Sequence, residues 1–379
     1  MTNNGNVFYF YRGRVALYAL LRALGVGPGD EVIIQAFTCL AVPVPVLALG
    51  ARPIYTDIDP ATYGMNPQQL PSCISGHTKA IVVQHTFGIP ADLDAIVLLA
   101  RKHGVAIIED CCHSLGSTYR GRELGSFGDA AFFSYEWGKP LTIGLGGSAL
   151  VNSEELRVRL QAQYSEYRVP SAAELLLIDL QYYAHRLIYR PSLFWPVKDL
   201  YHNLSAYGLL IGNFRAVEFD GKASADYRKC LSPRLRRRLS AIAGRSAPGI
   251  RRRKTIARQY DALMQKLGLA GLKLPSHCDP VLLRYPLLTT DKAAVLAAAR
   301  HLRVEAGEFF RTPVDPLAEG QWPIAGYDKN SCPVAEAISQ RIVTLPVTDR
   351  PGDEDMNTIL GFVEQMAGRG WLRPSLGLG

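Results

Sequence analysis

Lys139 is the only charged side chain between Glu136 and Glu154, and it lies in the window WGKPLTIGLGG. A lysine among apolar residues and glycines either has a charged partner or gives up its proton easily, because burial disfavours the ammonium form. Lysines of this kind form Schiff bases with carbonyl compounds. A lysine in a surface turn is the structural alternative, and this window alone leaves both interpretations open.

Asp110 ends the apolar run VAIIED (105–110). It therefore falls at the carboxyl end of an expected parallel strand, where α/β sheets place their ligands. A buried carboxylate there needs a cationic partner, which in pyridoxal phosphate enzymes is the ring nitrogen. The structural alternative is a helix N-cap. Ser134, five residues before Lys139, could offer a hydroxyl to a phosphate, although a serine in a strand alone indicates nothing.

Apolar, β-branched runs alternate with helical patterns through the first half of the chain. The expected strands are 32–37, 53–58, 80–85, 105–110, 130–135 and 147–152, and the expected helices include 16–24 and 93–104. Strands that alternate with helices predict a mostly parallel sheet covered by helices. Residues 32–51 are uncharged and reach the length of a membrane span, but Pro43 and Pro45 favour a strand, a loop and a buried helix instead.

The chain has 379 residues, 48% hydrophobic and 20% charged, which is the composition of an ordinary globular enzyme with two or three domains. We expect a large domain over 1–250, a long helix over 251–268 and a smaller C-terminal α+β domain that completes 251–379. The seven cysteines form no C-x-x-C pair, so neither a disulfide framework nor a metal site is predicted. With no legible secretory signal, a cytoplasmic protein is expected.

The positive charge is concentrated in one segment. Residues 222–254 hold twelve Lys and Arg against one Asp, a net +11, while the whole chain carries +8. The preceding stretch 160–210 is helical and aromatic, with Tyr182, Tyr183, Leu187, Ile188, Tyr189, Leu193, Phe194, Trp195 and Tyr201 flanked by Arg186 and Arg190. This composition suggests the hypothesis of peripheral contact with the inner face of a membrane through 160–254. The alternative is a dimer interface beside a solvated or phosphate-binding basic face, and the absence of interleaved aromatics disfavours nucleic acid.

Several longer blocks together resemble the DegT/StrS family of fold-type-I, pyridoxal phosphate-dependent sugar aminotransferases. The blocks are GVGPGDEVI (25–33), GARPIYTDID (50–59), HTFGIPADLDAI (85–96), IIEDCCHSLGSTYRGRELGSFGDAAFFSY (107–135), KPLTIGLGG (139–147), GNFR (212–215) and PVAEAISQRIVTLPV (333–347). The resemblance implies an α/β fold-type-I transferase, with a mixed, mostly parallel central sheet and a smaller C-terminal α+β domain.

The resemblance also implies roles for individual residues. Lys139 would form the Schiff base, Asp110 would hold the ring nitrogen, and His113 would approach the cofactor ring. It implies that Gly13, Arg14 and Ser134 surround the phosphate and that Cys39 lies near the ring. It also implies that Asn213 reaches the phosphate from the neighbouring subunit. A homodimer with shared active sites follows from that last role.

The sequence departs from the family pattern at four points. Arg14 replaces a Thr, Cys39 replaces a stacking aromatic, and Leu145 replaces a Glu. The separation of 74 residues between Lys139 and Asn213 is also longer than the family's by a few dozen residues.

The activity implied is transfer of an amino group, with glutamate as donor, to a keto-sugar that is nucleotide-linked, for amino-sugar, surface-polysaccharide or secondary-metabolite biosynthesis. The alternatives are a lipid-linked or non-sugar substrate at a membrane surface and a non-catalytic regulatory relative. The retained Asp110, His113, Ser134, Lys139 and Asn213 argue against the last.

Overall fold

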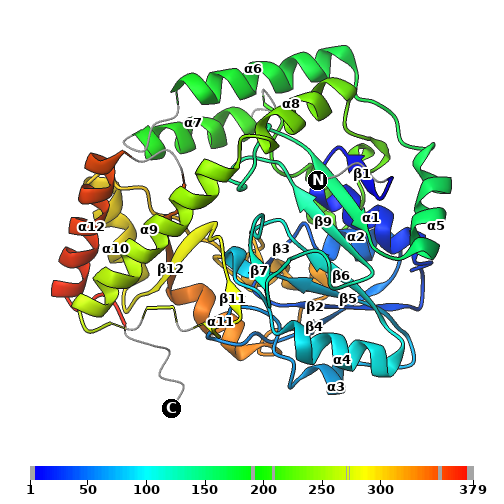
Figure 1. The fold of residues 1–379 in the computed structure, drawn as a ribbon, viewed down its shortest axis with the longest axis horizontal. Coiled ribbons are helices and arrows are strands. Elements are labelled where there is room, and N and C mark those ends of the chain that lie inside the picture. The colour runs from blue at the N-terminus through cyan, green and yellow to red at the C-terminus, as the bar shows by residue number, and fades with distance from the viewer. Residues whose placement is uncertain are drawn as a thin grey trace.

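A computed structural model describes residues 5–188, 193–206, 210–269, 271–272, 274–348 and 352–373 (Figure 1). Tyr189 and Arg190, which contributed to the membrane hypothesis, lie outside the described residues.

The central sheet has seven strands in the order β1-β10-β9-β6-β5-β2-β4. Their bounds are β1 (Val7–Phe10), β2 (Glu31–Gln35), β4 (Arg52–Thr56), β5 (Thr78–Gln84), β6 (Ala106–Asp110), β9 (Ala130–Ser134) and β10 (Gly147–Val151). Strand β10 runs antiparallel to both of its neighbours, while the other adjacent pairs are parallel. The mixed, mostly parallel sheet is therefore confirmed, and only β1 was not foreseen.

Two expected strands end earlier than their apolar patterns suggest. The run 32–37 leaves the sheet after Gln35, and the run 80–85 leaves it after Gln84. The backbone turns at Phe37 (φ 59°) and Phe87 (φ 57°), which adopt the left-handed region although both side chains are bulky. Their rings pack edge to face with centroids 6.0 Å apart, so buried aromatic packing holds both turns.

Alternating side chains of the sheet enter two hydrophobic cores, one on each face. One core joins Ile34, Val82, Ile108 and Phe132 to α1 (Gly13–Ala23), α2 (Pro43–Ala48) and α5 (Glu154–Tyr164). The other joins Ile33, Val83, Ile107 and Phe133 to α4 (Leu93–His103) and α8 (Pro233–Ala243). Both faces are covered, as a largely parallel sheet requires.

Local signals explain where these helices begin and end. The Asp92 carboxylate caps α4 by accepting from the Ala95 N–H at 3.3 Å, and Gly104 ends the helix at φ 66°, a conformation that favours glycine. The uncharged run 32–51 forms β2, the two-residue β3 (Thr38–Cys39) and α2, as its prolines predicted. Among the described residues, no helix is long and apolar enough to cross a membrane.

The C-terminal part begins with α9 (Ala247–Lys266), which starts four residues before the expected helix. Strands β12 (Arg284–Leu288) and β14 (Ile342–Pro346) form an antiparallel pair, accompanied by α10 (Lys292–His301), α11 (Pro333–Arg341) and α12 (Asp353–Gly368). Short strand pairings join the two parts of the chain. Strand β13 (Val314–Asp315) pairs with β3, and β11 (Cys278–Asp279) pairs with β7 (Thr118–Tyr119). Strand β7 also pairs with β8 (Arg122–Glu123). A domain division at 250/251 remains our proposal.

Within the stretch 160–210, the structure shows α6 (Ala172–Ile188) and α7 (Phe194–Ala206). Figure 1 shows these helices at one end of the molecule together with α8. Asp179 on α6 pairs with Arg234 of α8 at 2.8 Å and also with Arg238. Tyr182 and Trp195 are buried within the chain, so part of the aromatic stretch packs on its own protein.

Strand β10 passes so close to the start of α1 that only glycine fits at position 147. A Cβ atom there would lie 2.4 Å from the backbone of Arg12 and Gly13. We predict that Gly147→Ala lowers the free energy of unfolding by about 1–3 kcal/mol through overpacking. Gly361→Ala is the matched control, because that glycine lies within α12 with nothing near its Cβ. The control should be neutral or stabilising by about 0.5–1 kcal/mol in urea unfolding.

Candidate active site

The predicted site residues come from the ends of neighbouring strands and from one helix start. Asp110 ends β6, Ser134 ends β9, and the loop after β9 carries Lys139. Gly13 is the first residue of α1 and lies against Ser134, since a Cβ on Gly13 would be 3.0 Å from the Ser134 Cβ. Asn213 lines the same cavity as Lys139.

Asp110 is a buried carboxylate, 6% exposed. The backbone N–H of Cys112 donates to its Oδ1 at 3.0 Å. Burial raises the pKa of Asp110, while the bonds from Cys112 and the charge of Lys139 act in the opposite direction. In the described part of the chain, no lysine or arginine lies within 4 Å of this carboxylate. Asp110 therefore has room for a cationic partner that the protein does not supply.

His113 is buried between aromatic rings. Its ring is nearly parallel to that of Phe87 (8°, centroids 6.5 Å) and of Phe310 (21°, 6.1 Å), and Phe309 approaches it edge on. The Phe87 N–H donates to His113 Nδ1 at 3.3 Å, which assigns the proton of the neutral ring to Nε2. Burial, together with the charge of Lys139, lowers the pKa of His113 well below 6.5. At neutral pH His113 is therefore an uncharged donor.

The start of α1 and Ser134 form a small cup that could receive an anion. Arg12 precedes the helix without a capping side-chain bond, although its carbonyl accepts the Val15 and Ala16 N–H groups at 3.2 Å. The N–H groups of Gly13 and Arg14 are the ones that an anion could meet, in the direction that the helix dipole favours. The Ser134 hydroxyl lies 3.4 Å from the Glu136 carboxylate, which also pairs with Arg12. An anion that enters this cup meets both the helix amides and a competing carboxylate.

Two residues that depart from the family pattern, Arg14 and Cys39, lie within electrostatic reach of each other. The Arg14 guanidinium turns toward Glu218 at 3.0 Å and stacks over the Phe214 ring at 4.2 Å. Cys39 is partly buried, and burial raises the pKa of its thiol to about 11 against the effect of Arg14. The Cys39 thiol is therefore uncharged at neutral pH. Leu145 is buried in the core of the sheet's second face.

Lys139 lines an open cavity of about 1400 Å³. One wall comes from α6 and α7 with Tyr182, His185, Lys198 and Tyr201, and Trp137 stacks on Tyr182. The opposite wall comes from the C-terminal part of the chain, with Arg253, Arg284, Glu305, Glu308, Phe309 and Arg311. Helices α6 and α7 thus form a side of the cavity rather than a separate appendage.

Sequence reasoning missed several of these residues. Arg12 directly precedes Gly13, and Glu136 lies three residues before Lys139. Nothing in the local sequence around either residue indicated that the two form an ion pair. Arg284 is buried in β12 and pairs with Glu305, and Gly307 makes room for it, since a Cβ there would lie 2.5 Å from the Arg284 Nη2. Such long-range contacts leave no periodic signal in the sequence.

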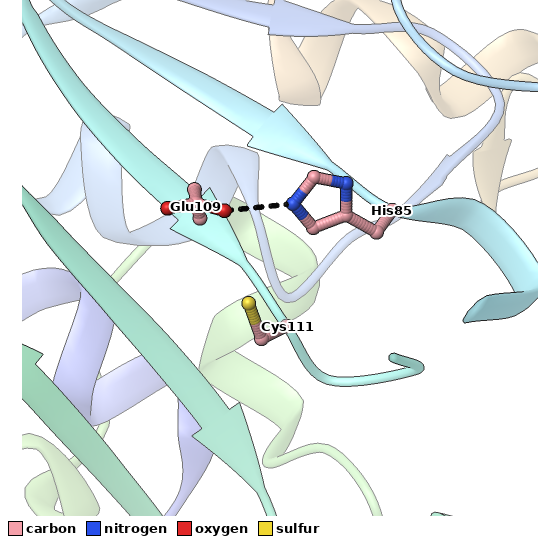
Figure 2. Close-up of side chains that lie close together, drawn as sticks. All are labelled: His85, Glu109 and Cys111. Atoms are coloured by element: carbon pink, nitrogen blue, oxygen red, sulfur yellow. Dashed lines mark hydrogen bonds and ion pairs between the residues drawn. The ribbon is translucent and has the colours of Figure 1, made fainter. Parts of the chain in front are cut away.

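A second cluster lies under Asp110. Ligand-type atoms of His85, Glu109 and Cys111 fall within 4.8 Å of one another (Figure 2). His85 Nε2 donates to Glu109 at 3.1 Å, because its Nδ1 accepts the Ala91 N–H. The Glu109 carboxylate also accepts three backbone N–H groups, those of Gly125, Phe127 and Gly128, at 2.7–2.9 Å.

These hydrogen bonds occupy both ring nitrogens of His85 and both oxygens of Glu109, which are two of the three ligands that a metal ion would need. We therefore assign a structural role to this cluster and propose no metal ion at it. It ties the 125–128 loop to β6 and so helps to fix the strand that ends at Asp110.

A protein-family model matches the chain on both sides of the segment that contains α6, α7 and α8. Residues 4–168 and 244–364 match the model of the DegT/DnrJ/EryC1/StrS aminotransferase family, so the chain belongs to this family. The unmatched residues 169–243 include α6, α7 and α8.

Among curated relatives, the L-glutamine:scyllo-inosose aminotransferase of Streptomyces griseus is 40% identical over 157 residues, which are 41% of this chain and 37% of that protein. The UDP-N-acetyl-3-dehydro-alpha-D-glucosamine 3-aminotransferase of Acidithiobacillus ferrooxidans is 42% identical over 150 residues, 39% of this chain and 41% of the relative. The similarity thus spans about two fifths of each relative's length.

The fold similarity extends further. The sugar aminotransferase Spr1654 of Streptococcus pneumoniae, solved in its pyridoxal phosphate form, superposes with a TM-score of 0.74 at 21% identity, over 96% of this chain and 87% of that one. This likeness confirms the fold-type-I architecture for nearly the whole chain, including the C-terminal part.

We predict that Asp110→Asn stabilises the ligand-free protein at neutral pH. Because burial raises the folded-state pKa of Asp110, its contribution to stability falls as pH rises through that raised value. The Tm of the variant should match wild type below the ordinary pKa of 3.8, exceed it as the pH rises above that value, and keep a constant lead once Asp110 has lost its proton in the folded protein. Asn can still accept the Cys112 N–H bond. Exposed Asp328→Asn is the control, and an equal or lower Tm for Asp110→Asn at pH 7 would contradict the prediction.

Proposed function

We propose that the protein is a pyridoxal phosphate-dependent aminotransferase that aminates a keto-sugar. The observation that carries the proposal is Asp110, a buried carboxylate without a cationic partner that lies within the electrostatic reach of Lys139. A protonated pyridine nitrogen is the partner that such a carboxylate would accept. Membership of the aminotransferase family supports the same chemistry.

The described residues fit this cofactor at three points. Asp110 would hold the ring nitrogen, and His113, neutral and stacked among aromatics, would lie against the ring. The amides at the start of α1 and the Ser134 hydroxyl would hold the phosphate. When bound, pyridoxal phosphate supplies a carbonyl carbon for amines and an electron sink for a carbanion.

The chain's own groups then have separate tasks. Lys139 would anchor the cofactor, and its amine, once free, would move the proton at the substrate carbon that carries nitrogen. The Asp110 carboxylate would keep a proton on the ring nitrogen. The walls formed by Trp137 and Tyr182 would restrict water around Lys139.

The charges of the cavity favour an anionic substrate. Lys139, Lys198, Arg186, Arg215, Arg253, Arg284 and Arg311 line it, against Glu305, Glu308 and Asp315. Guanidinium groups bind phosphates and carboxylates through paired hydrogen bonds. A nucleotide-linked keto-sugar and an amino-acid donor both carry such anions, and the cavity volume of about 1400 Å³ accommodates a large substrate.

The donor and acceptor are proposed on the family resemblance and on the names of relatives. Glutamate is our proposed donor, and the Streptomyces griseus relative makes L-glutamine the first alternative to test. The Acidithiobacillus relative acts by its name on a UDP-linked sugar, whereas the Streptomyces one acts on an inosose. We propose the nucleotide-linked sugar because of the surplus of cations in the cavity.

The decisive experiment asks whether the cofactor is attached to Lys139. In the loaded protein, borohydride reduction should attach the cofactor mass to the peptide that contains Lys139, and glutamate should bleach the visible absorbance band. Lys139→Ala should abolish the attachment and lower the transamination rate at least ~10²–10⁴-fold, the usual contribution of a positioned acid or base.

Lys198→Ala is a matched control, because Lys198 also lines the cavity but no role at the cofactor is proposed for it. It should retain cofactor attachment at Lys139. A reduced adduct on a different lysine would overturn the assignment. Attachment without bleaching by any amino acid would instead favour the non-catalytic regulatory relative.

We further propose a cytoplasmic homodimer with a membrane-facing patch. All seven cysteines are free, which suits a reducing compartment. Leu176, Leu180, Tyr183 and Leu187 follow each other along one face of α6 and are exposed, Leu187 by 80%. The neighbouring α8 exposes arginines 234, 236 and 237. An apolar stripe beside arginines is suited to an anionic membrane surface.

Flotation with anionic liposomes tests this patch. The protein should co-float at low salt, and attachment should weaken at high salt because screening shortens the reach of the arginines. Leu180→Glu with Leu187→Glu should abolish flotation, whereas Leu98→Glu, at an exposed leucine on α4, should not. If wild type never co-floats and the double variant dissociates the dimer, the patch is an interface between two copies.

A further inference from the structure

The cavity wall that comes from the C-terminal part of the chain contains a buried cation. Arg284 is the first residue of β12, lines the cavity and is only 7% exposed. A charge in such a place is costly unless neighbouring groups compensate for it. The partners of each guanidinium nitrogen therefore show which of these nitrogens serve the fold.

Two of the three guanidinium nitrogens are held by the protein. Arg284 Nη1 pairs with the Glu305 carboxylate, and Nε donates to Thr344 Oγ1 at 3.4 Å. Both partners are buried, with Glu305 4% and Thr344 0% exposed. The third nitrogen, Nη2, has no hydrogen-bond partner among the residues that the structure describes, and it is not sealed from solvent. Arg284 is thus fixed in place with one charged donor unused.

Gly307 keeps the space around this donor open. A Cβ atom at position 307 would lie 2.5 Å from Arg284 Nη2 and 2.7 Å from Thr344 Oγ1. The backbone is held there, because Gly307 and Thr344 exchange two backbone hydrogen bonds of 2.8 and 2.9 Å. Gly307 also lines the cavity. A larger residue at this position would therefore cover or displace Nη2, whereas glycine leaves it accessible.

Other cations of the same wall are directed differently. Arg253 is equally buried, and it donates to two backbone carbonyls of the chain. The Arg311 side chain is 50% exposed and pairs with Asp315 at 3.0 Å, where solvent screens its charge. An arginine that is already held loses little side-chain entropy on binding, and its charged N–H groups form strong hydrogen bonds with carboxylates and phosphates. Arg284 is therefore better prepared than these two cations to receive an anion.

We propose that Arg284 is a specificity-determining residue of the cavity, whose Nη2 donates to a carboxylate or phosphate oxygen of a bound substrate. Glu305 and Thr344 are positioning residues that hold the guanidinium. The pair of Arg284 and Glu305 has no net charge, so the surplus of cations in the cavity does not by itself predict a binding site here. The inference rests on the proposed function for the two sources of the anion, the amino-acid donor and the nucleotide-linked acceptor.

Two unreactive probes represent these sources. Glutarate has the carboxylates of glutamate but no amine, and UDP has the diphosphate of a nucleotide-linked sugar but no keto-sugar. Titration calorimetry on the protein as purified gives a Kd for each probe without any turnover. Binding of either probe through Arg284 supports the proposal. Loss of glutarate binding alone assigns the anion to the donor, and loss of UDP binding alone assigns it to the acceptor.

The informative variant removes both charges of the pair. Arg284→Gln with Glu305→Gln retains two hydrogen-bonding side chains and leaves the net charge of the cavity unchanged. It should raise the Kd of at least one probe about tenfold or more, which corresponds to about 1.4 kcal/mol. Glu305→Gln alone keeps the cation and should bind that probe as tightly as wild type or more tightly. Arg22→Gln with Glu166→Gln makes the same exchange at an exposed pair outside the cavity and should leave both Kd values unchanged.

These variants separate three explanations. An anion receptor at Arg284 predicts a loss of affinity only when Arg284 is replaced. A general effect of cavity charge predicts tighter binding for Glu305→Gln and no change for the neutral pair. A purely structural role predicts equal losses for both variants. Either of the last two results, or a wild-type protein that binds neither probe, would overturn the proposal.

Arg284→Lys replaces the double variant if the neutral pair does not fold, as judged from its Tm. Lysine keeps the charge but has a single nitrogen, which the Glu305 carboxylate engages. Probe binding should therefore fall as it does in the neutral pair. Wild-type affinity in Arg284→Lys would contradict the role of Nη2.

The binding site and the proposed function can fail independently. If glutamate bleaches the visible band but the neutral pair binds both probes like wild type, the site fails and the function stands. If a probe binds through Arg284 but no amino acid bleaches the band, the function fails and the anion site stands. Where turnover is observed, the neutral pair should raise the KM of the substrate that carries the anion by a larger factor than it lowers kcat.

Discussion

The close approach of β10 to the turn before α1 constrains the rest of the site. Gly147 lets the strand touch the backbone of Arg12 and Gly13, and Gly13 in turn lies on Ser134. A side chain at Gly147 would push the helix away from the sheet, and one at Gly13 would press on Ser134. Because of this contact, the amides of the helix start, a strand-end hydroxyl and two arginine side chains all converge on one small volume.

That convergence creates an electrostatic problem which the chain resolves by pairing. Arg12, Arg14, Arg215 and Lys229 lie among Glu136, Glu174, Glu218 and Asp226, in ion pairs of up to 3.9 Å. Four cations and four anions leave this network without net charge. In the proposed function, a phosphate would gain from the helix start and from the Ser134 hydroxyl, and it would compete with Glu136 for Arg12. The proposed phosphate site would thus depend on backbone geometry more than on a surplus of positive charge.

The sheet and the residues at the ends of its strands could be predicted because they follow from short-range patterns in the sequence. The strand that ends at Asp110 is buried from Ile107 onward and contains two β-branched isoleucines, and the helix that ends at Gly104 carries its own stop signal. In contrast, β1 has only four residues and alternates between buried and half-buried positions, so its pattern is too short to recognise. The placement of Asn213 could not be predicted either, because it depends on contacts with residues about 200 positions earlier.

The basic segment 222–254 shows why a linear charge count does not predict a surface potential. Its residues lie on helices and turns that point in different directions. Lys229 faces Glu174 and Asp226, and Arg238 faces Asp179. Arg253 is buried, where it donates to the carbonyls of Leu282 and Val347 at the cavity wall. A net charge of +11 along the sequence is therefore divided among internal ion pairs, one side of the cavity and an exposed row on α8.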